Sequence, residues 1–109
     1  MDTNLMIAKQ LEQTILESSV VVASPDQISS DLGDEAVILN LKSGIYHGLN
    51  EVGARVWAFL QQAKKVEEIL KMLLQEYDVD PEQCNNDLIA LLCNLSAAEL
   101  ISISNETAA

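Results

Sequence analysis

The stretch EAVILNLKSGIYHGLNEVG, residues 35–53, changes its hydrophobic period midway, and this change constrains the fold more than any other feature. Apolar residues alternate along its first half, which is typical of a half-buried strand. Lys42-Ser43-Gly44 has the composition of a tight turn. A second short apolar run follows, and Asn50 is a favourable helix N-cap. The stretch therefore predicts a β-hairpin that leads directly into a helix.

The length of the turn decides the register of this hairpin. A two-residue loop, Ser43-Gly44, would pair Leu41 with Tyr46 and put Ile45 on the other face. A three-residue loop, 42–44, gathers the apolar residues on one face by pairing Leu41 with Ile45, Leu39 with His47 and Val37 with Leu49. We favour the three-residue loop, because a slip of one residue reverses the facing of the whole strand. It also places Gly44 where a type I turn with a bulge needs a left-handed residue.

Helical periodicity predicts three helices after the hairpin, at about residues 51–62, 66–77 and 81–98. The third has the clearest start, with Asp80 as the cap, Pro81 at the first position and Gln83 completing a capping box. The expected core stripes are Val52, Val56, Phe59 and Leu60 with Trp57 at the margin, then Val66, Ile69, Leu70, Leu73 and Tyr77, then Leu88, Leu91, Leu92 and Leu95.

Three further segments are strand candidates of different strength. Residues 20–22 are short and β-branched, and residues 27–32 form a weaker candidate. Residues 100–103 add a short strand or simply pack on the core. Because strands come first and helices follow, the fold class is α+β.

The 109-residue length suggests one domain. We expect an N-terminal extension at 1–19, a domain at 20–103 and a tail at 104–109. The extension is either an amphipathic helix over 3–17 or partly frayed, and it lacks the pattern of a signal peptide.

The charge balance narrows the class of partner. Seventeen acidic residues against six basic ones give a formal charge of −11. Nucleic acid and anionic membranes both require a basic surface, so neither is an expected partner. A neutral or basic peptide, or a basic patch on another protein, fits better. No apolar run reaches the length of a membrane span, and the cysteine content suggests reduced thiols in the cytoplasm.

The sequence offers no catalytic or metal-binding motif. His47 is the only histidine and lies on an expected strand, where a structural or binding role is favoured. Cys84 and Cys93 are nine residues apart on one helix. At about 100° per residue they are separated by about 900°, or two and a half turns, so they point to opposite sides of the helix. They should form neither a disulfide nor a metal site. We therefore expect a protein that is not an enzyme and has no cofactor.

A resemblance to a known family, the PqqD-like proteins, rests on two segments, GDEAVILNLKSGIYHGLNEVGARVWAFL and VEEILKMLLQEYDVDPEQCNNDLIALLCNLSAAELI. The family is named for its member in pyrroloquinoline quinone biosynthesis. The resemblance covers about residues 28–103 and includes the Leu-Asn-x-x-Gly passage from strand to helix. The sequence departs at Lys65, where a Ser or Thr often caps the second helix, and at Glu99, where a Gly often ends the third.

The resemblance implies a winged helix-turn-helix-like fold, with a three-stranded antiparallel sheet followed by three helices. It also implies a function, because family members bind the leader segment of a ribosomally made precursor peptide and present it to a modifying enzyme. The leader adds as a strand to the third strand's edge and lies against the third helix. The corresponding residues here are Ile45, Tyr46, His47, Gly48 and Leu49 on the strand, and Gln83, Asp87, Ala90, Leu91 and Asn94 on the helix.

The expected partners are thus a precursor leader peptide and either a cysteine protease with its cyclase, as in lasso-peptide systems, or a radical SAM enzyme. Two other functions compete. A winged-helix DNA-binding protein is disfavoured by the charge and by a third helix without Lys or Arg. A small acidic carrier would need a modifiable serine at a helix start, usually within Asp-Ser-Leu, whereas this chain has Ser30-Asp31-Leu32 on an expected strand.

Overall fold

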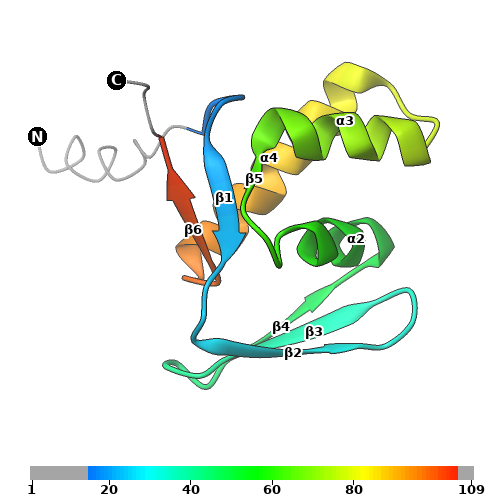
Figure 1. Cartoon of the computed structure of the whole chain (residues 1–109). Helices are drawn as coiled ribbons and strands as arrows, with labels where there is room; N and C mark the ends of the chain where they lie inside the picture. Colours follow the sequence, from blue (N-terminus) through cyan, green and yellow to red (C-terminus); the bar gives the residue numbers. More distant parts are fainter. Residues whose placement is uncertain (1–14, 106–109) are drawn as a thin grey trace, which may run out of the picture.

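The computed structural model describes residues 15–105 and confirms the α+β class, with a three-stranded antiparallel sheet followed by three helices (Figure 1). In chain order the elements are β1 (Val20–Ala23), β2 (Gln27–Asp31), β3 (Ala36–Asn40), β4 (Tyr46–Leu49), α2 (Glu51–Phe59), β5 (Lys64–Lys65), α3 (Val66–Glu76), α4 (Pro81–Ala97) and β6 (Ile101–Ser104). The helix expected at 3–17 lies almost wholly outside the described residues. Its described end, 15–17, belongs to no helix or strand.

A second sheet, which was not expected, joins the two ends of the described chain. Its strand order is β5-β1-β6, and β1 pairs with β6 over four residues, for example Val21 with Ile103. The segment 100–103 therefore contributes a strand. The backbone N–H groups of Val66 and Glu67 donate to the carbonyls of Ser19 and Glu17, which fixes the start of α3 against the segment before β1.

The hairpin between β3 and β4 has neither of the two registers that we considered. Asn40 lies opposite Ile45, Leu39 pairs with Tyr46 and Ile38 pairs with His47, so the loop has four residues, 41–44. Gly44 does take a left-handed conformation, at φ +74°. The buried face of β3 consequently carries Ala36, Ile38 and Asn40, whereas the expected buried residues Val37 and Leu39 are half-buried and Leu41 is exposed.

The side chain of Asn40 explains how a polar residue takes the place of an apolar one on the buried face. It is 4% exposed. Its amide nitrogen donates to the Ala98 carbonyl (2.8 Å), and its Oδ1 accepts from the backbone N–H groups of Lys42 (2.8 Å) and Ser43 (3.1 Å). Because its amide is hydrogen-bonded on both sides, its burial carries little desolvation penalty. Asn40 shapes the four-residue turn and ties it to the C-terminal end of α4.

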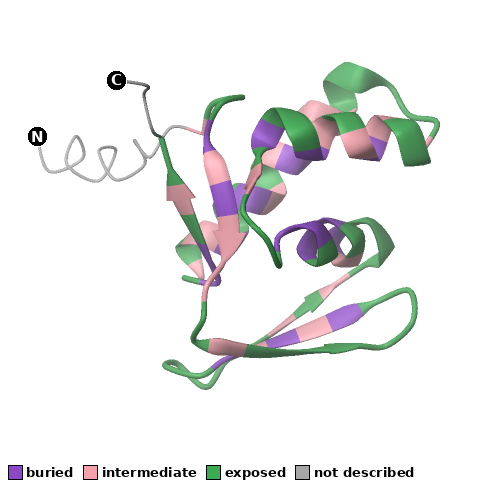
Figure 2. Ribbon diagram, in the orientation of Figure 1, coloured by how far each residue is buried: buried purple, intermediate pink, exposed green. Residues whose placement is uncertain are grey.

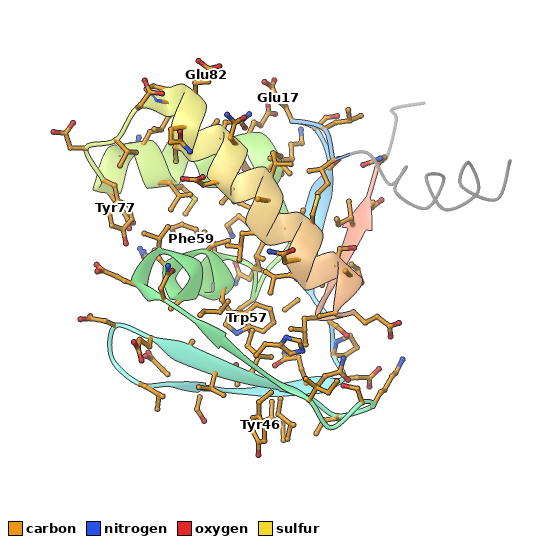
Figure 3. The ribbon with its side chains drawn as sticks, turned by 180° about the vertical axis from the view of Figure 1, so that it is seen from behind. Glu17, Tyr46, Trp57, Phe59, Tyr77 and Glu82 are labelled. Carbon is orange, nitrogen blue, oxygen red and sulfur yellow. The ribbon has the colours of Figure 1, made fainter. Side chains whose placement is uncertain are left out.

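Helix α2 lies between the β2–β3–β4 sheet and the pair α3 and α4 (Figure 1), and for this reason it is buried on more than one side. Trp57, expected at the margin, is 4% exposed and lies toward the sheet, while Phe59 lies toward the other helices (Figure 3). Val52, expected in the core, is 43% exposed. The other expected core stripes are buried or half-buried as predicted.

The helix ends follow from local sequence. Asn50 and Asp80 cap α2 and α4 by accepting from the N–H groups of Gly53 and Gln83, both at 2.9 Å. The expected reciprocal bond, from the Asp80 N–H to the Gln83 side chain, does not form; the amide nitrogen of Gln83 donates to Asp87 instead (2.9 Å). At the end of α4, Glu99 and Leu100 donate to the carbonyls of Ser96 and Leu95, which is a Schellman motif. Glu99 sits at the left-handed position of this motif, at φ +59°.

Candidate functional site

The unpaired side of β4 offers backbone groups to a further strand. β4 is at one edge of the β2-β3-β4 sheet. Asn40 donates to the Ile45 carbonyl (3.0 Å), which fixes the alternation of the antiparallel ladder. By this alternation Ile45, His47 and Leu49 face β3, whereas the N–H and C=O groups of Tyr46 and Gly48 point away from the sheet.

The two edges of this sheet differ in their protection. An exposed edge invites pairing with another chain unless charge, a bulge or a cover blocks it. At the other edge, β2 ends in Asp31, and Asp26 and Asp34 flank it. β4 has the sequence Tyr-His-Gly-Leu, with no acidic residue, lysine or arginine. Of these two edges, β4 is the better acceptor for a peptide strand.

An apolar pocket of about 180 Å³ lies among α2, α3 and α4. It is lined by Val52, Val56, Leu73, Tyr77, Val79, Gln83, Cys84, Asp87, Leu88 and Leu91. Its volume is well below the roughly 300–1,000 Å³ of sites for drug-sized ligands. It therefore suits one inserted side chain better than a free small molecule.

The end of β4 is joined to a pocket-lining helix, α2, by a tight corner. A Cβ atom at Gly53 would lie 3.3 Å from both Leu49 Cβ and Asn50 Oδ1, so only glycine fits here without displacement. This is the physical reason for the Leu-Asn-x-x-Gly passage. Val52, one residue before this glycine, lines the pocket. The first pocket-lining residue of α2 is thus three residues beyond Leu49, the last residue of β4.

The structure brings together part of the residue set expected from the sequence. Gln83, Asp87 and Leu91 line the pocket, while Ala90 and Asn94 are exposed on α4 outside it. On β4 itself, Tyr46 and Gly48 are exposed, His47 and Leu49 are half-buried, and Ile45 lies in the turn, 55% exposed. The sequence analysis did not predict that Val52 and Val79 line the pocket. The one indication in the sequence was the apolar Val79 between two acidic residues, Asp78 and Asp80.

Two ionisable side chains that line the pocket, Cys84 and Tyr77, have raised pKa values. Burial raises the pKa of the Cys84 thiol, and the negative charge of Asp87 adds to this effect. A raised pKa leaves little thiolate at neutral pH. Burial also raises the pKa of the Tyr77 hydroxyl, helped by Glu51 and Glu76. Within residues 15–105, no group of three or more His, Cys, Asp or Glu side chains is placed to hold a metal ion.

A larger cleft, of about 470 Å³, lies on the other side of α2, against β2. Its lining mixes polar and apolar residues and includes Asp31, Asp34 and Glu51. Arg55, also in this lining, is held by Glu76 through two hydrogen bonds of 2.7 Å. The cleft is thus larger but adjoins the acidic edge of the sheet, so we assign the candidate site to the smaller, apolar pocket.

Comparison with known proteins identifies a related family. The family model for coenzyme PQQ synthesis protein D (PqqD) matches residues 35–101. The structure of TbiB1 in complex with the TbiA(beta) leader peptide is similar, with a TM-score of 0.70 and 37% sequence identity, over 74% of this chain and 94% of that chain. No curated protein matches the sequence.

Two more distant structures share the fold. Lasso peptide synthetase B1 complexed with the leader peptide has a TM-score of 0.66 and 22% identity, over 75% of this chain and 96% of that chain. The solution structure of the PqqD truncation of Methylobacterium extorquens PqqCD, a stand-alone recognition element for ribosomally synthesized and post-translationally modified peptides, has a TM-score of 0.66 and 19% identity, over 82% of this chain and 95% of that chain.

Proposed function

The chain belongs to the PqqD family, and we propose that it is a non-catalytic recognition module for the leader of a ribosomally made precursor peptide. In this proposal the leader adds as a fourth strand along β4 and inserts one apolar side chain into the pocket among α2, α3 and α4. The recognition domain is residues 20–103, and the chain presents the bound precursor to a peptide-modifying enzyme in the cytoplasm. That enzyme is a cysteine protease with its cyclase, or a radical SAM enzyme.

The proposal rests mainly on one observation: β4, an unprotected edge strand, leads directly into α2, which lines an apolar pocket. Strand addition needs outward backbone groups for affinity and side-chain pockets for specificity. β4 supplies the first through Tyr46 and Gly48, and the pocket supplies the second through Val52, Val79 and Leu91. TbiB1, at 37% identity, is in complex with a leader peptide, which supports leader binding by this chain.

The energetics require both parts. Tyr46 and Gly48 each offer one N–H and one C=O group, and each hydrogen bond contributes about 0.5–1.5 kcal/mol net. The four bonds of the ladder therefore give roughly 2–6 kcal/mol, which is less than the roughly 8 kcal/mol that micromolar affinity needs. Burial of a large apolar side chain in the pocket adds about 1.5–3 kcal/mol. Peptides without such a side chain should bind weakly.

The absence of a catalytic role rests on the placement of the reactive groups. The single histidine, His47, is half-buried on β4, whereas both cysteines lie on α4. The cysteine nearer the site has a thiol whose pKa is raised, which opposes its use as a nucleophile. In this proposal the precursor leaves the protein chemically unchanged unless a partner enzyme acts on it.

The two cysteines provide a test within one helix. Cys84 lines the pocket, and Cys93 is exposed on α4 outside it. The synthetic leader of the precursor encoded beside the chain, at saturation, should slow alkylation of Cys84 by iodoacetamide roughly tenfold or more and leave Cys93 unchanged. Mass spectrometry of the two cysteine peptides gives both rates from the same sample, and a leader of scrambled sequence is the control. Equal rates for Cys84 with and without a leader shown to bind would contradict occupation of the pocket, and a leader that does not bind at all would contradict the function.

A further inference from the structure

The exposed apolar side chains of the described chain gather at two places. Val52 and Val79 line the pocket already assigned to the leader. Apart from Leu16, near the start of the described residues, the other large exposed apolar residues belong to the β2–β3–β4 sheet and its turns: Ile28 (57%), Leu32 (59%), Leu41 (52%), Ile45 (55%) and Tyr46 (68%). Leader binding in the pocket leaves this second group unexplained.

Two of these residues, Ile28 and Tyr46, lie on the face of the sheet that points away from the helices. The register places Ile28, Leu39 and Tyr46 opposite one another in one row across the three strands. The neighbouring row is Ser30, Val37 and Gly48. Figure 3 shows Tyr46 pointing away from the body of the molecule, and Figure 2 shows much of this sheet as exposed. We call these two rows the outer face.

The outer face carries no charge in a strongly acidic protein. Neither of its rows contains an acidic or basic residue, although the chain has a formal charge of −11. The ion pair between Lys42 and Asp26 (3.5 Å) lies beyond the rows, at the hairpin end. An apolar surface framed by polar residues is typical of a protein–protein contact.

We infer that the outer face is the docking surface for the peptide-modifying enzyme, and that the bound leader completes it. This inference rests on the proposed function, because a leader strand beside β4 extends the rows by one strand. Its alternate side chains then lie next to Tyr46 and Gly48 on the same face. The enzyme contacts the recognition module and its bound leader together, so it binds the leader-bound (loaded) protein more tightly than the leader-free (empty) protein.

The alternative occupant, a second copy of the chain, is disfavoured by charge. Two chains with a formal charge of −11 each repel one another, and at physiological ionic strength this repulsion acts over about 8–10 Å. The outer face also adjoins the leader edge, since Tyr46 and Gly48 belong to both. A modifying enzyme on the outer face would lie next to the bound leader on which it acts, whereas a second copy of the chain has no need to contact the leader.

Ile28 separates enzyme docking from leader binding. It lies on β2, with β3 between it and the leader edge, and its exposed side chain can be changed with little effect on folding. The variants are Ile28→Ser and Ile28→Glu, and the matched control is Leu16→Ser, which removes an exposed leucine away from the outer face. The probe is the purified modifying enzyme encoded beside the chain. Its affinity for each variant is measured by calorimetry, with and without saturating leader, and leader affinity is measured in the same preparations.

The expected result is that the enzyme binds the loaded parent and the Leu16→Ser control alike, binds the empty parent more weakly, and binds both loaded Ile28 variants about tenfold more weakly or worse. Leader affinity should be the same for all four proteins. If the Ile28 variants bind the enzyme like the parent while leader affinity is intact, the outer face is not the docking surface, although leader recognition stands. If the parent dimerises by sedimentation and Ile28→Glu is monomeric, the face belongs to a second copy and the inference is wrong.

Discussion

Replacing Asn40 by alanine should lower the stability of the domain and change how the β3–β4 hairpin is held against α4. The side chain of Asn40 makes three hydrogen bonds, to the Ala98 carbonyl and to the N–H groups of Lys42 and Ser43. Alanine removes all three. It frees the hairpin turn from the C-terminal end of α4. Both β4 and α4 are proposed to contact the leader.

The magnitude follows from the number of bonds and the burial. Three net contributions of about 0.5–1.5 kcal/mol each give a loss of roughly 2–4 kcal/mol. At about 4 °C per kcal/mol for a domain of this size, Tm should fall by roughly 10 °C. Asn40→Asp keeps the acceptor for the two turn amides but replaces the donor to Ala98 by a second acceptor, so it turns the link to α4 into a repulsion and adds the cost of a buried carboxylate. Leader affinity should decrease in both variants.

Thermal unfolding followed by circular dichroism, with urea titration for the free energy, measures this loss. Asn86→Ala is the matched control, because Asn86 is exposed on α4 and alanine is the better helix former there. A loss below about 1 kcal/mol in Asn40→Ala would show that the buried asparagine does not hold the turn, and the reasoning on its burial would be wrong.

Three further outcomes are expected. Glu99→Gly should stabilise the protein by about 0.5–1 kcal/mol in urea unfolding, because Glu99 holds a left-handed conformation that only glycine adopts without strain; unchanged stability would contradict this. Tyr46→Pro should stay folded and lose leader binding, while His47→Pro should lower Tm more, since the amide of His47 faces β3 and that of Tyr46 faces outward; equal leader affinity for parent and Tyr46→Pro would exclude this edge. Arg55 lowers the pKa of the Glu76 carboxyl through its hydrogen bonds. This pair therefore stabilises the fold above the ordinary pKa of glutamate and ceases to do so as pH falls through the lowered pKa. In Arg55→Met, NMR titration should show a higher pKa for Glu76 than in the parent, and an unchanged pKa would refute the pairing in solution.

Much of the fold was predictable because its signals are local. The caps Asn50 and Asp80 fix where α2 and α4 begin, and once α4 begins at Pro81 its period decides that Gln83, Asp87 and Leu91 share a face. The second sheet was not predictable in the same way. Its strands β1 and β6 are short and lie at opposite ends of the described chain, so no local pattern indicates that they pair.

The hairpin register failed for a physical reason. β3 is apolar on both faces, so alternation alone does not decide which face is buried, and we placed the polar Asn40 outside. The structure buries it because its amide finds three partners, one of them far away in sequence. The pocket was only partly predicted for a related reason: Val52 and Val79 meet α4 through the packing of the helices, which no single helical pattern contains.

Amide hydrogen exchange at the two sheet edges, measured by NMR with and without the leader, tests directly whether the leader adds as a strand to β4. We predict that the leader slows exchange at the amides of Tyr46 and Gly48, which point outward from β4. The outward amides of β2, those of Gln27, Ser29 and Asp31, should exchange as before. Protection at β2 with unchanged exchange at β4 would contradict strand addition at the β4 edge.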